Sequence, residues 1–533
     1  MRNSRAFING KIFTSDDNNP YAESMIVENG MIKWVGKTKD IPDDDFDVTD
    51  LQGRCVLPGF IDAHMHAGML AEQSGQISCL PPLIHSIEEL SDSIKKLRRE
   101  QGQGKWIRGW GYDEGKMEER RLINRYDLDE ACNDSPIAIT RTCAHIMMVN
   151  SVALKLAGID RNTPDPQGGR IDRDENGEPV GILRENAKEL VSSIIPVMSD
   201  EEMDAAVLAV GELLSSQGIT SATDMGSLEG KDHYDSFIKA SAAGFRQRMA
   251  LYYIWDFFGD KPEYVSDRIK KSRDGRISAA GLKLLADGSV SGRTAWMDIP
   301  YLGSDEDCGM PVCTDELLDS AIDFCRENKC QLSVHAMGTR AIERIVERVG
   351  KEDSWTADCV PFARVEHVTE PSEKAIDIAA EKGIMFVTQP NFLYAEIESY
   401  IRNLGIHRLR RTYPVRHMLQ KGVKLAFSTD APATAWAVPS DPLPCIKFAV
   451  TRCAYDGTDC GRDEAVDIET AVKLYTRFSA EAAGFEKVGQ LRKGFHADFI
   501  VLDRDIMTET PENIDEIKVL ETYINGEAVY IRK

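Results

Sequence analysis

The sequence predicts an α/β protein in which a (β/α)8 barrel carries a small β-sandwich domain built from both ends of the chain. From residue 205 onward, short apolar runs alternate with helical stretches, which is the order of a parallel barrel. Both ends consist of short alternating segments separated by turns. About 150 residues separate the first barrel strand from the second, where a βα loop has about 2–6, so the sequence also predicts a large insertion.

The β-sandwich domain is predicted to combine residues 1–57 with residues 484–533. The two segments share alternating apolar and polar residues, as expected of strands with one buried face. Asn-Gly pairs suit tight hairpin turns, and the sequence predicts three of them, at Asn9-Gly10, Asn29-Gly30 and Asn525-Gly526.

The barrel is predicted to occupy residues 58–483. Eight short apolar runs are its candidate strands: 56–66, 218–226, 245–255, 277–288, 330–338, 362–370, 383–391 and 423–432. Segments 314–329 and 339–350 repeat apolar residues at three- and four-residue intervals, which predicts helices between the strands. Eight parallel strands with intervening helices close into a TIM-like barrel.

Residues 69–205 are predicted to form the insertion after the first barrel strand. The segment has its own candidate helix at 86–102 and candidate strands at 106–114 and 136–142. Insertions at the carboxyl ends of barrel strands commonly shape substrate pockets, so we expect a substrate-pocket subdomain on that face.

Charge and composition limit the partners. With 64 basic and 87 acidic residues the formal net charge is −23, which argues against a nucleic-acid partner. No apolar run has the length of a membrane span, and the start "MRNSRAFING" lacks the apolar segment of a secretory signal. We therefore expect a cytoplasmic protein that acts on a small molecule, and a homodimer as the oligomeric state.

Two histidines stand one residue apart in "PGFIDAHMHAG", at the end of the first candidate strand. Side chains at i and i+2 of a strand point to the same side, so the imidazoles of His64 and His66 face one way. A pair of this kind can arise by chance. As part of a larger cluster it would form one wall of a metal site.

Four further residues with suitable chemistry lie toward the carboxyl ends of later candidate strands: Lys283, His335, His367 and Asp430. Any one of these residues, taken alone, is more simply interpreted as a structural residue. In a barrel, however, these ends meet on the face that carries the active site. The sequence therefore predicts that they converge with the histidine pair.

The motifs "VLPGFIDAHMH", "KLLADGS", "VHAMG", "VEHV" and "STDAP" resemble the metal-dependent amidohydrolase superfamily, in particular the branch with N-substituted formamide deformylases (amidohydrolase family 3). The resemblance covers nearly the whole chain. It implies a first metal position at His64, His66 and Asp430, a second at His335 and His367, and a carboxylated, bridging Lys283. One or two divalent ions are expected, with Zn²⁺ favoured by the ligand types and Fe, Mn, Co or Ni as alternatives.

Two of these residues have simpler interpretations. An unmodified lysine has a reference pKa of ~10.4 and no lone pair to donate, so Lys283 paired with Asp287 would leave a one-metal site. Asp430 is expected to take a proton from the attacking water and pass it to the leaving nitrogen. It could also cap a helix before Pro432, which is compatible with that role.

The resemblance also implies residues that bind substrate. His145 is expected to bind substrate or stabilise the transition state, with a buried histidine bonded to backbone as the alternative. The other candidates are Arg141, Asn150, Glu185, Trp296 and Tyr112. One departure stands out, because Thr339 occupies the place where the family usually has Asp, which leaves any charge-dependent role of that position in doubt.

These expectations predict a hydrolase that cleaves a C–N bond in an amide, an N-substituted formamide or a cyclic amide with a metal-activated water. The same water could attack an ester, a lactone or, with no feature that favours it, a phosphotriester. A different class is a catalytically silent relative with a regulatory role, although such a protein has no need to keep all six ligand positions.

Overall fold

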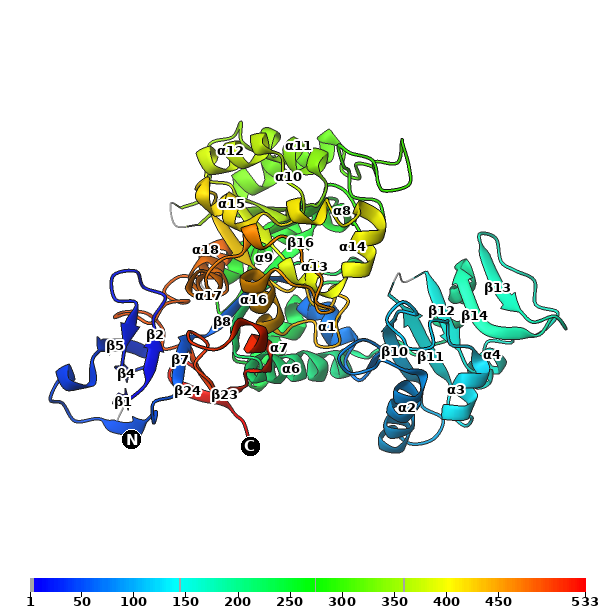
Figure 1. Cartoon of the computed structure of the whole chain (residues 1–533), viewed down its shortest axis with the longest axis horizontal. Helices are drawn as coiled ribbons and strands as arrows, with labels where there is room; N and C mark the ends of the chain where they lie inside the picture. Colours follow the sequence, from blue (N-terminus) through cyan, green and yellow to red (C-terminus); the bar gives the residue numbers. More distant parts are fainter. Residues whose placement is uncertain (1–3, 143–144, 274, 358–359) are drawn as a thin grey trace. The chain divides into compact units, whose positions relative to one another are not determined.

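The computed structural model describes residues 4–142, 145–273, 275–357 and 360–533 (Figure 1). The chain divides into two compact units. The first unit comprises Met1–Glu72, Asp200–Thr434 and Ser440–Lys533, and the second comprises Gln73–Ser199 and Ala435–Pro439. Both ends of the chain therefore belong to the unit that contains the barrel.

The barrel is a sheet of eight strands in which each strand pairs in parallel with the next one along the chain. This arrangement confirms the predicted (β/α)8 fold. In order the strands are β8 (Phe60–Met65), β15 (Ile219–Asp224), β16 (Arg248–Ile254), β17 (Ile277–Leu285), β18 (Gln331–Ala336), β19 (Ala363–His367), β20 (Met385–Thr388) and β21 (Leu425–Phe427).

The first and last strands meet through the residues at their carboxyl ends. The backbone N–H of Asp430, just after β21, donates to the carbonyl of His64 on β8 at 2.8 Å. Asp62 of β8 accepts from both the backbone N–H and the hydroxyl of Thr429. Two segments that are 367 residues apart in sequence are thereby joined, and the barrel is nearly closed.

Helices cover the outside of the barrel because each has one apolar face. Helix α11 buries Ala341, Ile342, Ile345, Val346 and Val349, the spacing that its sequence predicts. Helices α9, α10 and α11 pack on strands β17 to β19. The helices of this unit are α1 (Ala67–Glu72), α6 (Asp200–Ser216), α7 (Tyr234–Ala243), α8 (Trp255–Phe258), α9 (Pro262–Ser272), α10 (Asp315–Asn328), α11 (Thr339–Val349), α12 (Glu373–Lys382), α13 (Pro390–Ala395), α14 (Ile397–Leu404), α15 (Val415–Gln420), α16 (Pro442–Thr451), α17 (Ile468–Leu474) and α18 (Arg477–Ala483).

The two ends of the chain form two further sheets. One sheet has the order β5-β4-β1-β6 and the other β24-β23-β22-β7-β2-β3, so the latter joins C-terminal to N-terminal strands, as predicted (Figure 1). Their bounds are β1 (Ser4–Ile8), β2 (Lys11–Phe13), β3 (Tyr21–Ala22), β4 (Ser24–Glu28), β5 (Met31–Gly36), β6 (Asp47–Asp50), β7 (Cys55–Pro58), β22 (Phe499–Leu502), β23 (Val519–Ile524) and β24 (Glu527–Ile531).

Two of the three predicted hairpins are present. Asn29-Gly30 joins β4 to β5 and Asn525-Gly526 joins β23 to β24, each between antiparallel partners. The prediction for Asn9-Gly10 is wrong, because β1 pairs with β4 and β6 whereas β2 pairs with β3 and β7. The turn there carries the chain from one sheet to the other. The local Asn-Gly signal fixes a tight turn but not the partners of the strands on either side.

The second unit contains a six-stranded sheet in the order β13-β14-β12-β11-β10-β9. Ile137, Ile139 and Met148 face one apolar cluster, while Ala138, Met147 and Val149 face another, so both faces of the sheet are covered. The elements of this unit are β9 (Ile77–Ser78), α2 (Ile87–Gln101), β10 (Ile107–Tyr112), α3 (Arg125–Ala131), β11 (Ile137–Arg141), β12 (Ile146–Val149), α4 (Ser151–Leu156), β13 (Gly169–Arg173), β14 (Pro179–Glu185) and α5 (Glu189–Ser192).

No helix within the described part of the chain has both the length and the apolar character needed to cross a membrane.

Phe499 ties the two ends of the chain together. Its ring lies 4.9 Å from that of Phe7 and 4.3 Å from that of Tyr523, in a fully buried position. We expect Phe499→Ala to destabilise the protein by about 3–5 kcal/mol, because the cavity adds to the lost apolar burial. The midpoint of thermal unfolding should fall clearly, whereas Val48→Ala, at a 58% exposed position of β6, should change it little. Equal midpoints for the two variants would contradict this.

Candidate metal centre

The six residues predicted as metal ligands lie at the carboxyl ends of five barrel strands. His64, Lys283 and His335 are on β8, β17 and β18, and His367 is the last residue of β19. His66 and Asp430 follow β8 and β21 by one and three residues. All are buried except His335, which is partly exposed.

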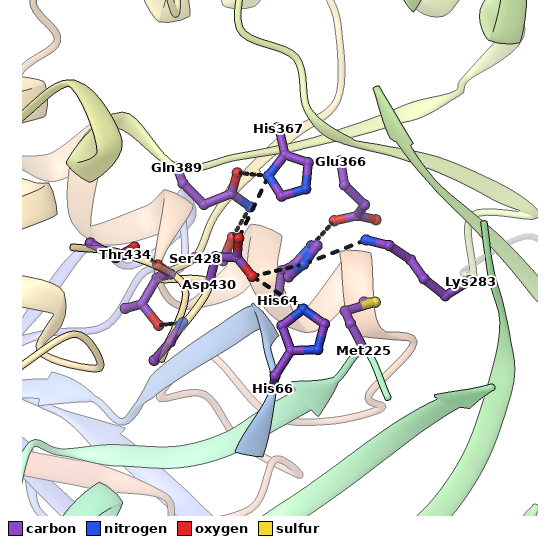
Figure 2. A network of polar contacts seen from close by, with 12 residues as sticks. His64, His66, Met225, Lys283, Glu366, His367, Gln389, Ser428, Asp430 and Thr434 are labelled. Atoms are coloured by element: carbon purple, nitrogen blue, oxygen red, sulfur yellow. Dashed lines mark hydrogen bonds and ion pairs between the residues drawn. The ribbon is translucent and has the colours of Figure 1, made fainter. Parts of the chain in front are cut away.

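Figure 2 shows five of these side chains turned toward one another, those of His64, His66, Lys283, His367 and Asp430. Ligand atoms of His64, His367 and Asp430 lie within 4.8 Å of one another. The imidazole ring of His64 is 5.6 Å from that of His66, and the ring of His335 is 4.3 Å from that of His367. Nζ of Lys283 is 3.5 Å from Nε2 of His64. The structure therefore assembles the predicted cluster from separate strands.

The hydrogen bonds of His64 and His66 determine which ring nitrogen carries the proton. Nδ1 of His66 is 2.6 Å from the carbonyl oxygen of Gly226, which can only accept, so His66 donates through Nδ1. Nδ1 of His64 is 2.6 Å from Oε2 of Glu366. Burial works to raise the pKa of Glu366, but Arg364, Lys283 and Ser333 together keep this pKa below its usual value, so Glu366 is an acceptor. In both imidazoles Nε2 is left with a lone pair.

Both of these lone pairs face a carboxylate. Oδ1 of Asp430 is 3.2 Å from Nε2 of His64 and 3.4 Å from Nε2 of His66. Oδ1 is buried and accepts no hydrogen bond from any residue that the structure describes. Three electron-rich atoms pointing at one another repel unless a cation lies between them. Two imidazole nitrogens and a carboxylate oxygen are also donors that suit Zn²⁺, so these residues fit a divalent metal.

The other two histidines are held in the same manner. Nε2 of His335 donates to the carbonyl of Gly288 at 2.9 Å, which leaves a lone pair on Nδ1. Nδ1 of His367 donates to Oε1 of Gln389 at 2.7 Å, because the amide nitrogen of Gln389 donates in turn to Ser428. Each of the four imidazoles thus has one nitrogen that donates to the protein and one that keeps a lone pair, and the lone pair on Nε2 of His64 lies 3.5 Å from Nζ of Lys283.

Burial shapes the charges of the cluster. It lowers the pKa of all four imidazoles, that of His335 to about 3, so they are neutral and able to act as ligands. It also lowers the pKa of Lys283 to about 8 and raises that of Asp430. Both shifts disfavour the charged forms, as expected for groups removed from water.

Two of the predicted ligands have a backbone conformation that most residues avoid. His367 has φ 73° and Asp430 has φ 56°, both in the left-handed region. On β19, Arg364 and Glu366 share one face, so regular strand geometry would turn His367 away from them. The left-handed φ at the last residue of the strand instead brings its imidazole toward His64. Such backbone is commonly retained where a site requires it.

Asp287, the alternative partner predicted for Lys283, makes different contacts. Its carboxylate accepts the backbone N–H groups of Trp296, Met337 and Gly338 at 2.8–3.0 Å. The carboxylates that favour the charged ammonium of Lys283 are Glu366 and Asp430. Asp287 therefore ties the loop after β17 to the loop after β18.

The alternative role of Asp430 as a helix cap is also wrong. Its carbonyl accepts from Ala433 in a turn, and the next helix, α16, begins beyond it with Asp441 as its cap.

Thr339 and Trp296 lie where Asp287 connects the loop after β17 to the loop after β18. A Cβ on Gly338 would come within 2.5 Å of the backbone of Trp296, so only glycine permits the close approach of the two loops. Thr339 is the first residue of α11 and is buried, and its hydroxyl finds no hydrogen-bond partner within the described residues. Thr339 therefore supplies no charge where the family usually has Asp. The predicted contact of Trp296 with substrate stays a prediction.

The remaining predicted substrate-binding residues all belong to the second unit. His145 is exposed and bonded through Nδ1 to Glu185 at 2.9 Å, so the alternative of a buried histidine bonded to backbone is wrong. Both line a cavity of about 630 Å³. Arg141 forms an ion pair with Glu114.

Asn150 and Tyr112 have contacts typical of structural residues. Asn150 caps α4, and both ends of its side-chain amide bond to the backbone. Oδ1 accepts from Ile137 and Ala153, and Nδ2 donates to Cys132 and Ser135. Tyr112 is buried and donates to the carbonyl of Arg121. These contacts favour a role in folding for both residues, and their predicted role in substrate binding stays a prediction.

Several residues around the cluster escaped the sequence analysis. Glu366 and Gln389 orient His64 and His367, while Asp62 and Thr429 join the ends of β8 and β21. One signal was available: Arg364 and Glu366 are charged residues at i and i+2 of an apolar strand, which places two charges on its inner face. Nothing local in the sequence marks the others.

Eight parallel strands that carry four histidines, a lysine and an aspartate at their carboxyl ends define the class of barrel hydrolases with a metal centre. A model of the amidohydrolase family matches residues 47–530, and the chain belongs to this family. It is an enzyme family of metal-dependent hydrolases, as the resemblance predicted.

Individual proteins agree with this assignment. The chain is 29% identical to the putative amidohydrolase YtcJ of Bacillus subtilis (strain 168) and 29% identical to an N-substituted formamide deformylase of Arthrobacter pascens. In both comparisons 98% of each protein is covered. A crystal structure of an uncharacterized metal-dependent hydrolase from Pyrococcus horikoshii OT3 superposes with a TM-score of 0.73 at 25% identity, covering 95% of this chain and 99% of that one.

The cluster leads to a prediction about metal content. We expect His335→Ala to lower the metal bound per chain, because it removes an imidazole whose Nδ1 lone pair has no other use. Elemental analysis of the purified variant measures this directly. His407→Ala is the control, since His407 is exposed and has no hydrogen bond or ion pair to the six residues among the contacts of the described chain. Unchanged metal content in His335→Ala would remove His335 from the ligand set.

Proposed function

We propose that this protein hydrolyses a C–N bond in an amide, an N-substituted formamide or a cyclic amide. One observation carries the proposal: the Nε2 atoms of His64 and His66 converge on the unpaired Oδ1 of Asp430, a set of donors that suits a divalent cation. The choice of a C–N bond is supported by the relative that is an N-substituted formamide deformylase.

The proposed metal ligands are the residues whose lone pairs converge in the cluster. His64, His66 and Asp430 would hold one divalent ion, and His335 and His367 a second. Zn²⁺ suits imidazole and carboxylate donors, and Fe, Mn, Co and Ni are chemically acceptable. Lys283 would join the two positions as a carbamate.

The surroundings of Lys283 favour that modification. Attack on carbon dioxide requires the neutral amine, and burial lowers the pKa of Lys283 to about 8, which increases the neutral fraction at neutral pH. The amine nitrogen forms a bond to the carbon of carbon dioxide and loses a proton. The product is an anion with two oxygen donors.

The chemistry then divides between metal and protein. When bound, a divalent ion lowers the pKa of a coordinated water toward ~7 and polarises a carbonyl. Oδ1 of Asp430 faces the imidazoles of His64 and His66, whereas Oδ2 lies 4.0 Å from Nδ1 of His367. We propose that Oδ2 of Asp430 carries the transferred proton. The carboxylate takes this proton from the attacking water and gives it to the departing nitrogen. Burial raises the pKa of Asp430, which strengthens it as a base.

Residues 69–205 are proposed to supply the substrate pocket, with His145, Glu185 and Arg141 as contacts, and Trp296 from the loop after β17. In this proposal residues 1–57 and 484–533 form a supporting β-domain of the barrel at 58–483. A cytoplasmic homodimer remains the expected setting.

A substrate panel tests the proposal. Enzyme loaded with Zn²⁺ is assayed against N-substituted formamides, cyclic amides and simple amides, with esters and lactones of matched size. We expect the highest kcat/KM on a C–N substrate and loss of activity after chelation. Asp430→Asn should lower kcat by about 10²–10⁴ through the lost proton transfer. Faster cleavage of esters or lactones would shift the function to those bonds, and metal-bound protein without any activity would favour a regulatory relative.

The carbamate can be examined separately. We expect wild-type protein to hold two Zn²⁺ per chain and to incorporate labelled bicarbonate, seen as a carbamate signal by NMR. Lys283→Ala should lose the signal and bind less metal. If the wild-type protein binds metal without any carbamate signal, Lys283 is an unmodified neighbour of the site.

A further inference from the structure

A buried ion pair lies directly against the candidate metal centre. Arg364 and Glu366 are both fully buried on β19, and their side chains are paired to each other. Oε1 of Glu366 also accepts the hydroxyl of Ser333 at 2.8 Å, and Oε2 accepts Nδ1 of His64 at 2.6 Å. Figure 2 shows Glu366 beside the imidazole of His64.

The arginine is held as firmly as the carboxylate. Its guanidinium donates to the carbonyls of Ala63 and Ala482 and lies 5.6 Å from the ring centroid of Tyr252. Charges in a barrel interior are costly, and well-packed apolar residues of similar volume often serve stability equally well. Stability alone therefore does not explain this pair.

Among the described residues, Glu366 is the only carboxylate that makes a hydrogen bond to one of the four imidazoles, since Oδ1 of Asp287 is 3.5 Å from Nε2 of His335 and the carbonyl of Gly288 is the closer acceptor, at 2.9 Å. His66 and His335 donate to backbone carbonyls, and His367 donates to the amide of Gln389. A carboxylate bonded to the second nitrogen of a metal-binding histidine fixes its tautomer and increases its basicity. His64 is thus distinguished from the other three.

We propose that Glu366 is a positioning residue for metal binding: it keeps the proton of His64 on Nδ1, so that the Nε2 lone pair points at Asp430. Arg364 and Ser333 hold the carboxylate in place for this purpose. The inference rests on the proposed function in one respect, because it takes His64 as a metal ligand.

The substitution Glu366→Gln tests the proposal, because the hydrogen-bond donors around position 366 determine how the glutamine amide is oriented. Ser333 and Nε of Arg364 both donate to the Oε1 position, whereas Nη2 of Arg364 is the one arginine donor at Oε2, at 3.0 Å. The amide oxygen of glutamine is therefore expected at the Oε1 position, which has the larger number of fixed donors. The amide nitrogen then faces Nδ1 of His64 and can only donate. His64 would have to accept through Nδ1 and carry its proton on Nε2, where it blocks the metal.

Glu370→Gln is a matched control. Glu370 forms a buried ion pair with Arg408, also in the barrel unit, and makes no contact with any of the four imidazoles in the described structure. Both variants leave a buried arginine without its carboxylate, so both should lose stability. Only the change at Glu366 alters the partner of a proposed ligand.

The experiment measures the affinity of full-length protein for Zn²⁺ by competition with a chelator. We expect Glu366→Gln to bind Zn²⁺ about 10–100-fold more weakly than wild type, and Glu370→Gln to match wild type. Equal affinities in all three proteins would overturn the inference. Equal losses in both variants would also overturn it, because the effect would then be one of stability. If wild-type protein fails to bind Zn²⁺, the proposed function fails instead.

A second measurement needs no variant at position 366. Metal-free wild-type protein labelled with nitrogen-15 in histidine is examined by NMR, and the His64 signals are identified by their loss in His64→Asn. We expect His64 to be neutral with its proton on Nδ1. A proton on Nε2 would overturn the inference even if Glu366→Gln cannot be purified in folded form. In a folded variant the proton should move to Nε2.

Discussion

The junction between the first and last barrel strands is the constraint on which the centre depends. Asp62 accepts two hydrogen bonds from Thr429, and the carbonyl of His64 accepts one from Asp430. These bonds bring β8 and the segment after β21 together, and they set Oδ1 of Asp430 opposite the imidazoles of His64 and His66. Without this junction His64 and His66 would lie at one edge of the sheet and Asp430 at the other.

Burial gives this cluster its chemistry and makes it costly. Removal from water keeps the imidazoles neutral and favours the uncharged form of Lys283, both of which suit coordination. The same burial leaves the Oδ1 atom of Asp430 without a hydrogen bond from the described residues. An arrangement of this kind is unfavourable for the protein alone and becomes favourable when a cation is shared. The donors of this cluster therefore suit a shared cation, as the proposed function assumes.

The ends of the strands also contain features that suit the site more than the stability of the barrel. β19 ends at His367 with a left-handed backbone, and Glu366 and Arg364 put charges where apolar side chains usually fill a barrel. Asp287 connects the loops after β17 and β18, with Gly338 allowing their close approach. At the ends of β18 and β19 the partly exposed His335 lies beside the buried His367. The inserted second unit, with its own two apolar clusters, folds around a separate sheet.

Sequence alone determined the eight strands, the joining of the two ends and the six residues that meet in the cluster, because apolar periodicity and position at strand ends are local properties of the chain. It did not determine the partners of Asn9-Gly10, the free state of Oδ1 in Asp430, or the contacts of Asp287. Nor did it reveal Glu366 and Gln389 as the groups that orient His64 and His367. Only the tertiary structure decided these, since a tautomer or a close approach depends on atoms from distant segments, and the barrel must close before those atoms meet.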